Sequence, residues 1–213
     1  MFEGILSPMT ETTSTASLSR GPADHDVRDQ ILEAAEEHFS RYGYDKTTVS
    51  DLAKAIGFSK AYIYKFFDSK QAIGEAICSK RLSAMVVAVE EAVAGASTAT
   101  EKFRRLFKSL TVTGASLFFN DRKLHDIAAH GAGEGWPSAR AYAERIRQIL
   151  MNIVREGRET GEFERKTPLD ETVHAIYLVV HPYVNPLLLQ HNLDLIEDAP
   201  AQLSNLVLRS LAP

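Results

Sequence analysis

Apolar residues recur at intervals of three or four positions along nearly the whole chain after residue 26. Val27, Ile31, Ala35 and Phe39 begin the pattern, which places an apolar stripe on one face of an α-helix. Similar stripes follow between successive turn residues, and no segment alternates convincingly as a half-buried strand does. The sequence therefore predicts an all-α fold, with a three-helix bundle at the N-terminus followed by a larger helical domain.

Turn and capping residues suggest where the helices begin and end. Residues 1–25 are rich in Ser, Thr, Gly and Pro and are predicted to be a disordered arm. Residues 26–72 are assigned to the bundle and residues 73–213 to the larger domain. Helix-capping side chains are expected at Thr48, Ser59, Asp68 and Thr167. A short helix is expected over 123–129, with Gly131, Gly133 and Gly135 breaking the chain after it, and a last helix over about 194–211.

Composition excludes several classes of protein. The chain has 213 residues, a formal net charge of −4 and one cysteine, Cys78, so a disulfide framework within one chain is impossible. No apolar run is long enough to span a membrane, and the first residues lack the pattern of a secretory signal. We expect a cytoplasmic protein that does not bind a membrane.

Two short helices joined by a tight turn at Gly57 are predicted over residues 48–67. This spacing is typical of a helix-turn-helix, in which the first helix braces against the DNA backbone and the second enters the major groove. Residues 46–70 contain five lysines and two aspartates, a net charge of +3 in a chain that is negative overall. A local basic patch of this kind favours contact with phosphate groups.

The segment from Gly43 to Lys70, which reads GYDKTTVSDLAKAIGFSKAYIYKFFDSK, closely resembles the DNA-binding domain of TetR-family regulators. The helical run over 31–39 and the turn over 157–163 are similar to the family as well. The resemblance implies binding of double-stranded operator DNA by a homodimer, in which the last two helices, about 168–190 and 194–211, form the interface. Repression is the usual mode of the family.

The resemblance also implies a role for individual residues of the bundle. Thr47 and Thr48 would contact phosphate at the start of the bracing helix, and Lys70 would do so at the start of the fourth helix. Tyr64 would meet the DNA backbone. Where the family more often has glycine and a small hydroxyl residue, this chain has Ala61 and Tyr62, so the operator sequence is not transferable. The predicted DNA-binding set is Thr47, Thr48, Ser59, Lys60, Ala61, Tyr62, Tyr64, Lys65 and Lys70.

Aromatic residues and one histidine in the larger domain suggest a pocket for a small effector. Aromatic rings form apolar walls, while Tyr and His provide polar handles, and Pro182 and Pro186 should kink or interrupt a helix there. We expect an apolar or amphipathic ligand that releases the protein from DNA. The predicted pocket residues are Phe103, Phe107, Phe118, Trp136, Tyr142, Tyr177 and His181.

Two other classes of function remain open from the sequence. One is a helical enzyme, although no nucleophile elbow, HExxH motif or Walker loop is present. The other is an architectural DNA-binding protein without an effector. Histidine pairs such as His174 and His181 lack the carboxylates or cysteines of a metal site. No catalytic residue, metal or cofactor is predicted.

Overall fold

The computed structural model describes residues 22–213, and every regular element in this range is a helix. The elements are α1 (Pro22–Tyr42), α2 (Val49–Ile56), α3 (Lys60–Ile63), α4 (Lys70–Ala94), α5 (Ala99–Asn120), α6 (Arg122–Gly133), α7 (Pro137–Thr160), α8 (Leu169–Val184), α9 (Pro186–Leu189), the 3-10 helix η1 (Leu193–Leu195) and α10 (Ala199–Ser210). This confirms the predicted all-α class.

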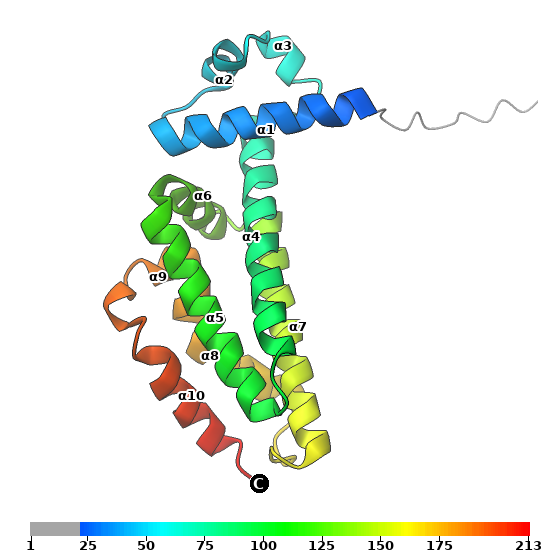
Figure 1. The fold of residues 1–213 in the computed structure, drawn as a ribbon, viewed down its shortest axis with the longest axis vertical. Coiled ribbons are helices and arrows are strands. Elements are labelled where there is room, and N and C mark those ends of the chain that lie inside the picture. The colour runs from blue at the N-terminus through cyan, green and yellow to red at the C-terminus, as the bar shows by residue number, and fades with distance from the viewer. Residues whose placement is uncertain (1–21) are drawn as a thin grey trace, which may run out of the picture.

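Helices α1 to α3 form a small bundle at one end of the molecule, which we call the headpiece (Figure 1). The stripe of α1 supplies Ile31, Ala35 and Phe39, none of which has exposed surface. These side chains pack in a common apolar cluster with Leu52 of α2 and Ile63 of α3. The periodicity that predicts α1 therefore also identifies the centre of the headpiece.

Helices α4 to α10 form the larger part of the molecule, which we call the core. α4 begins under the headpiece and runs lengthwise into the core (Figure 1), where it packs against α5 and α7. α8 packs against α7 and α5, and α10 lies along α5. α6 contacts α1 as well as α4, α5 and α7, so that it joins the headpiece to the core.

Several helix boundaries differ from the predictions. α1 begins at Pro22, so residues 22–25 are helical rather than part of a disordered arm; residues 1–21 lie outside the described residues. α6 continues through Gly131 to Gly133, because its last turn is packed against the headpiece, and only Gly135 turns the chain, with a φ of +64°. The predicted last helix is divided into η1 and α10.

Two predicted caps are also wrong. The side chain of Ser69, not that of Asp68, caps α4 by accepting a hydrogen bond from the Ala72 amide at 3.0 Å. α8 begins after Pro168 without a capping side chain, and the Thr167 amide instead donates to the Glu164 carboxylate at 3.2 Å. Capping residues that follow one another in sequence compete, and tertiary packing decides between them.

The seam between headpiece and core is built around Trp136, which is 3% exposed. Its ring meets the ring of Tyr44 edge-on, with the centroids 5.7 Å apart. A Cβ atom on Gly74 or Gly131 would lie 2.9 Å or 2.8 Å from this ring, closer than atoms approach in packed interiors. The two glycines therefore allow α4 and α6 to close around one aromatic wedge.

Candidate functional site

The predicted helix-turn-helix is present in α2 and α3. Thr48 and Asp51 form a reciprocal capping box, in which the Thr48 hydroxyl accepts from the Asp51 amide at 3.2 Å and the Asp51 carboxylate accepts from the Thr48 amide at 2.9 Å. Gly57 then ends α2 with a φ of +72°, a left-handed conformation that glycine adopts at little cost. Ser59 caps α3 by accepting from the Tyr62 amide at 3.1 Å.

The headpiece exposes a set of lysines that have no ion-pair partner among the described residues. Lys54 lies on α2, Lys60 at the start of α3 and Lys65 just after it, and all three are exposed. Lys46, in the loop before α2, is exposed as well. Unpaired ammonium groups on one small bundle create a positive potential that attracts a polyanion.

Aromatic rings are interleaved with these lysines. The ring of Tyr62 lies between those of Phe58 and Phe66, with centroids 5.0 Å and 5.4 Å away. The Lys65 ammonium is 5.4 Å from the Tyr62 ring, and the Lys60 ammonium is 5.7 Å from the ring of Tyr64, which is 41% exposed. Tyr62 thus packs against two phenylalanine rings. Tyr64, Ser59 and Ala61 are exposed.

Thr47 and Lys70 are placed differently from the other predicted DNA-binding residues. The Thr47 side chain is 1% exposed, and its hydroxyl donates to the Gly43 carbonyl at 2.8 Å. Thr47 is therefore a packing residue, and its hydroxyl is not on the exposed face. The Lys70 ammonium donates to the Tyr44 carbonyl at 3.1 Å and lies 4.3 Å from the centre of the Tyr44 ring. Lys70 links α4 to the headpiece through this contact.

Four of the predicted effector residues do not line a common cavity. Phe103 and Phe107 are 1% and 0% exposed and belong to the apolar centre of the core. Phe118 packs edge-on against His125, with ring centroids 4.9 Å apart, and Trp136 fills the seam described above. The aromatic composition was a poor guide here, because packing residues and pocket residues look alike in a sequence.

The other three predicted residues do share a cavity. Tyr142 of α7 and Tyr177 and His181 of α8 line a partly open pocket of about 160 Å³ between α4, α6, α7 and α8, and we call it the core pocket. Leu82, Ala128, Val184 and Pro186 contribute apolar walls. Arg140, Arg147 and Asn185 also line it. The prediction missed the two arginines, because α7 carries arginines on several faces and the sequence does not show which of them lie beside the pocket.

Burial determines the protonation of the groups around the core pocket. It raises the pKa of the Tyr142 hydroxyl, which has no hydrogen-bond partner among the described residues. It lowers the pKa of His181, and the nearby Arg147 guanidinium acts in the same direction. Tyr142 is therefore a neutral donor and His181 a neutral imidazole at neutral pH. The Arg147 guanidinium lies 4.0 Å from the centre of the Tyr177 ring.

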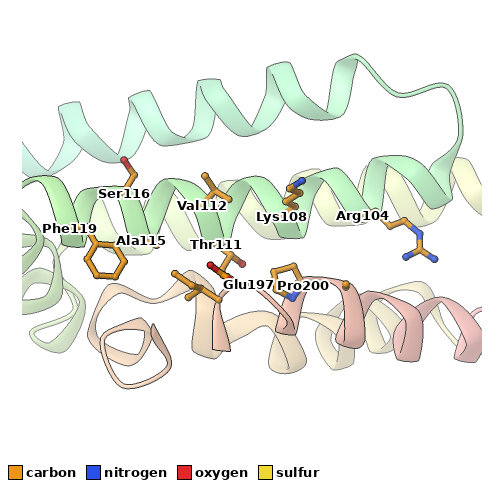
Figure 2. A pocket seen from close by; sticks show the side chains of 11 residues that line it. Arg104, Lys108, Thr111, Val112, Ala115, Ser116, Phe119, Glu197 and Pro200 are labelled. Atoms are coloured by element: carbon orange, nitrogen blue, oxygen red, sulfur yellow. The ribbon is translucent and has the colours of Figure 1, made fainter. Parts of the chain in front are cut away.

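A larger groove, of about 620 Å³, lies at the surface between α5 and α10. Figure 2 shows Phe119, Ala115 and Thr111 of α5 on the side that faces Pro200 and Glu197, with Lys108 and Arg104 farther along the helix. None of the predicted effector residues lines this groove. Its walls combine buried residues such as Thr111 and Ala115 with exposed ones such as Val112 and Phe119.

Two family descriptions match the chain, one in each half. "Bacterial regulatory proteins, tetR family" matches residues 31–77, and "Tetracyclin repressor-like, C-terminal domain" matches residues 99–203. The chain belongs to the TetR family. The predicted resemblance is thereby confirmed, and it extends beyond the helix-turn-helix into the core.

Known proteins similar to this TetR-family chain are named as regulators. The biofilm operon negative transcriptional regulator IcaR of Staphylococcus aureus is 45% identical over 49 residues, which are 23% of this chain and 26% of IcaR. The chain thus spans about a quarter of the length of this curated relative. The TetR-family regulator PfmR from Thermus thermophilus is 26% identical, with a TM-score of 0.54 over 85% of this chain and 98% of PfmR.

The fold of most of this TetR-family chain is also found in FadR from Bacillus subtilis, solved in complex with stearoyl-CoA. This structure covers 84% of the chain and 97% of FadR with a TM-score of 0.64, at 21% identity.

Among residues 22–213, no three His, Cys, Asp or Glu side chains are grouped so as to hold a metal ion, and no helix is both long and apolar enough to cross a membrane.

Proposed function

We propose that this TetR-family chain is a transcriptional repressor that binds palindromic operator DNA as a homodimer and is released by a small molecule in the core pocket. The observation that carries the proposal is the set of exposed lysines on and next to α2 and α3, which form no ion pair within residues 22–213. They lie on a helix-turn-helix whose two caps and left-handed turn are all in place. Members of the family are regulators rather than enzymes.

On DNA, the start of α3 would face base edges in the major groove. Lys60 and Ala61 are exposed in its first turn, which is the part of a recognition helix that reaches bases. Thr48, Ser59, Tyr64 and Lys65 would contact the phosphates on either side, and such contacts fix the register of the protein on the duplex. Lys70 would approach phosphate with the ammonium hydrogens that Tyr44 does not engage.

A dimer would supply the second helix-turn-helix. Leu178 of α8 is 57% exposed and Leu206 of α10 is 61% exposed, and the two helices pack against each other. Exposed leucines on neighbouring helices suit burial against a second copy. In a two-fold dimer the recognition helices would contact half-sites about 34–36 Å apart.

Release from DNA would use the helices that touch both the core pocket and the headpiece. On α6, Ala128 and Ala132 line the pocket, while the ring of His130 lies 5.3 Å from the Tyr44 ring. On α4, Leu82 lines the pocket, while Lys70 holds Tyr44. A ligand that shifts either helix would change the spacing of the two headpieces, provided that it prefers the DNA-incompetent state.

The size of the core pocket argues for a small effector. FadR from Bacillus subtilis was solved with stearoyl-CoA, but a cavity of about 160 Å³ is below the roughly 300 Å³ at which sites for drug-sized ligands begin. We therefore propose an effector much smaller than a long-chain acyl-CoA.

A salt titration of matched lysine variants tests the DNA-binding part of the proposal. The slope of log K against log salt is negative, and replacing Lys65 by alanine should reduce its magnitude by about one unit, as expected for one lost phosphate contact. Lys166→Ala removes the same charge from the exposed loop before α8 and should leave the slope unchanged. Equal slopes for all three proteins would show that Lys65 contacts no phosphate and would contradict the proposed DNA-binding face.

A further inference from the structure

The core pocket carries positive charge without any carboxylate in its walls. Arg140 and Arg147 line it, and none of the other lining residues is Asp or Glu. Arg140 is partly engaged, since it donates to the Gly135 carbonyl. The nearest acid to Arg147 is Glu144, 3.6 Å away, but this side chain is 73% exposed and lies outside the lining. An exposed ion pair of this kind is weak, so Arg147 remains available to a ligand.

The Tyr142 hydroxyl provides a second and independent indication of a ligand. Tyr142 lines the core pocket, is 6% exposed and has no hydrogen-bond partner among the described residues. A buried hydroxyl without a partner is unfavourable, because it has lost its bonds to water without gaining others. Since the hydroxyl stays protonated, it would donate to an acceptor on a bound molecule.

The remaining walls restrict the rest of the ligand. Alanines of α6 and α7, with Leu82 and Val184, supply an apolar part of the lining, to which Tyr177 adds its ring. The small volume of the pocket leaves room for one ring or a short chain. His181, whose ring lies 5.5 Å from that of Tyr177, is the other titratable group in the lining besides the two tyrosines and two arginines.

We infer that the core pocket binds a small organic monocarboxylate, with its anionic end at Arg147 and the Tyr142 hydroxyl and its apolar end against α4 and α6. This inference rests on the proposed function only in treating the pocket as the effector site. A carboxylate has the acceptor oxygens that both groups lack. Its charge would meet the guanidinium of Arg147, whose side chain is 39% exposed, and hydrogen bonds between charged groups are stronger than those between neutral groups.

The test compares acids with their neutral amides on the full-length protein by isothermal titration calorimetry. The probes are benzoate, compared with benzamide, and hexanoate, compared with hexanamide. Each amide has nearly the same shape as its acid but no charge. We expect at least one acid to bind at least about tenfold more tightly than its amide, the size expected for a hydrogen bond to a charged group. Acids that bind no better than their amides, or that do not bind at about 10 mM, would overturn the inference.

Variants locate the binding within the pocket. Arg147→Gln should lower the affinity for the acid about tenfold or more and leave the affinity for the amide unchanged, which also shows that the variant is folded. Tyr142→Phe should weaken binding severalfold without changing the preference for the acid. Arg155→Gln removes an arginine from an exposed position of the same helix and should have no effect. An unaltered acid affinity in Arg147→Gln would overturn the assignment.

The outcome for the ligand is separable from the outcome for DNA binding. A gel shift of the wild-type protein on a selected duplex, without any probe, reports on the proposed function alone. If the duplex is bound but acids show no preference over amides, only the ligand class is wrong. If acids bind as expected but no duplex is retained, the proposed function fails and the pocket assignment stands.

Discussion

The headpiece and the core of this TetR-family protein differ in where their functional groups lie. The headpiece presents its lysines on an exposed face, above an apolar centre of Ile31, Phe39 and Leu52. The core gathers buried tyrosines and more exposed arginines around a pocket of about 160 Å³ between four helices. A surface site tolerates change in its own side chains without loss of the fold, whereas an interior site shares its residues with the packing that stabilises the protein.

The largest expected effect is the loss of stability in Phe107→Ala. Phe107 has no exposed surface and meets the Tyr183 ring edge-on at 5.6 Å, so truncation should leave a cavity and cost about 3–5 kcal/mol of unfolding free energy. Urea unfolding at one fixed protein concentration measures this. A variant of unchanged stability that no longer binds the ligand would instead show that Phe107 belongs to the effector site, as the sequence predicts.

Next in size is the expected loss of the dimer in Leu206→Glu. A charge placed at the centre of an apolar interface should weaken association by about 2 kcal/mol or more, while the headpiece stays folded. Sedimentation should then show monomers at concentrations where the wild type is dimeric. Lys54→Glu places a negative charge on an exposed position of α2 in the headpiece and serves as the control. An intact dimer would place the interface on other helices.

A smaller effect, on DNA alone, is expected from Lys60→Ala. Because Lys60 is exposed and pairs with no carboxylate among the described residues, its loss should leave stability nearly unchanged. The free energy of binding to the correct operator should weaken by about 1–3 kcal/mol, and that of binding to random DNA by much less. Competition binding on both duplexes measures the difference. Equal losses would make Lys60 a backbone contact instead.

The smallest effect is a dependence of stability on pH. Burial lowers the pKa of His125, which is 1% exposed and near Asp126 and Arg122. Below the unfolded pKa of about 6.5, the unfolded chain takes up a proton that the folded chain does not, so stability falls as pH falls. His125→Leu should reduce this slope between about pH 7.5 and 5.5, and His181 accounts for part of what remains. Identical slopes would contradict the assignment.

The same contrast explains how much could be predicted from the sequence. In the headpiece, the signals are local: the Thr48 capping box, the Gly57 turn and the Ser59 cap each involve residues a few positions apart. In the core, Trp136 and Tyr142 are equally aromatic, yet one fills the seam with the headpiece and the other lines the pocket. That difference depends on how α4, α6, α7 and α8 come together, which no local pattern records.

The arginines of the core pocket show the same limit. Arg145, Arg147 and Arg155 all lie on α7, but only Arg147 of these three lines the pocket. The inward face of α7 follows from its contacts with α4 and α8, not from its charges. For Thr47, the resemblance to the family favours a phosphate contact, whereas packing under α1 buries its hydroxyl.

Selection of bound duplexes from a random pool tests the central claim most directly, since it asks whether this protein reads DNA sequence at all. The account predicts enrichment of one palindrome, bound at least about 10³-fold more tightly than random DNA at physiological salt, with a steep salt dependence that Lys65→Ala reduces. A pool without enrichment, or equal affinity for selected and random duplexes, would contradict it.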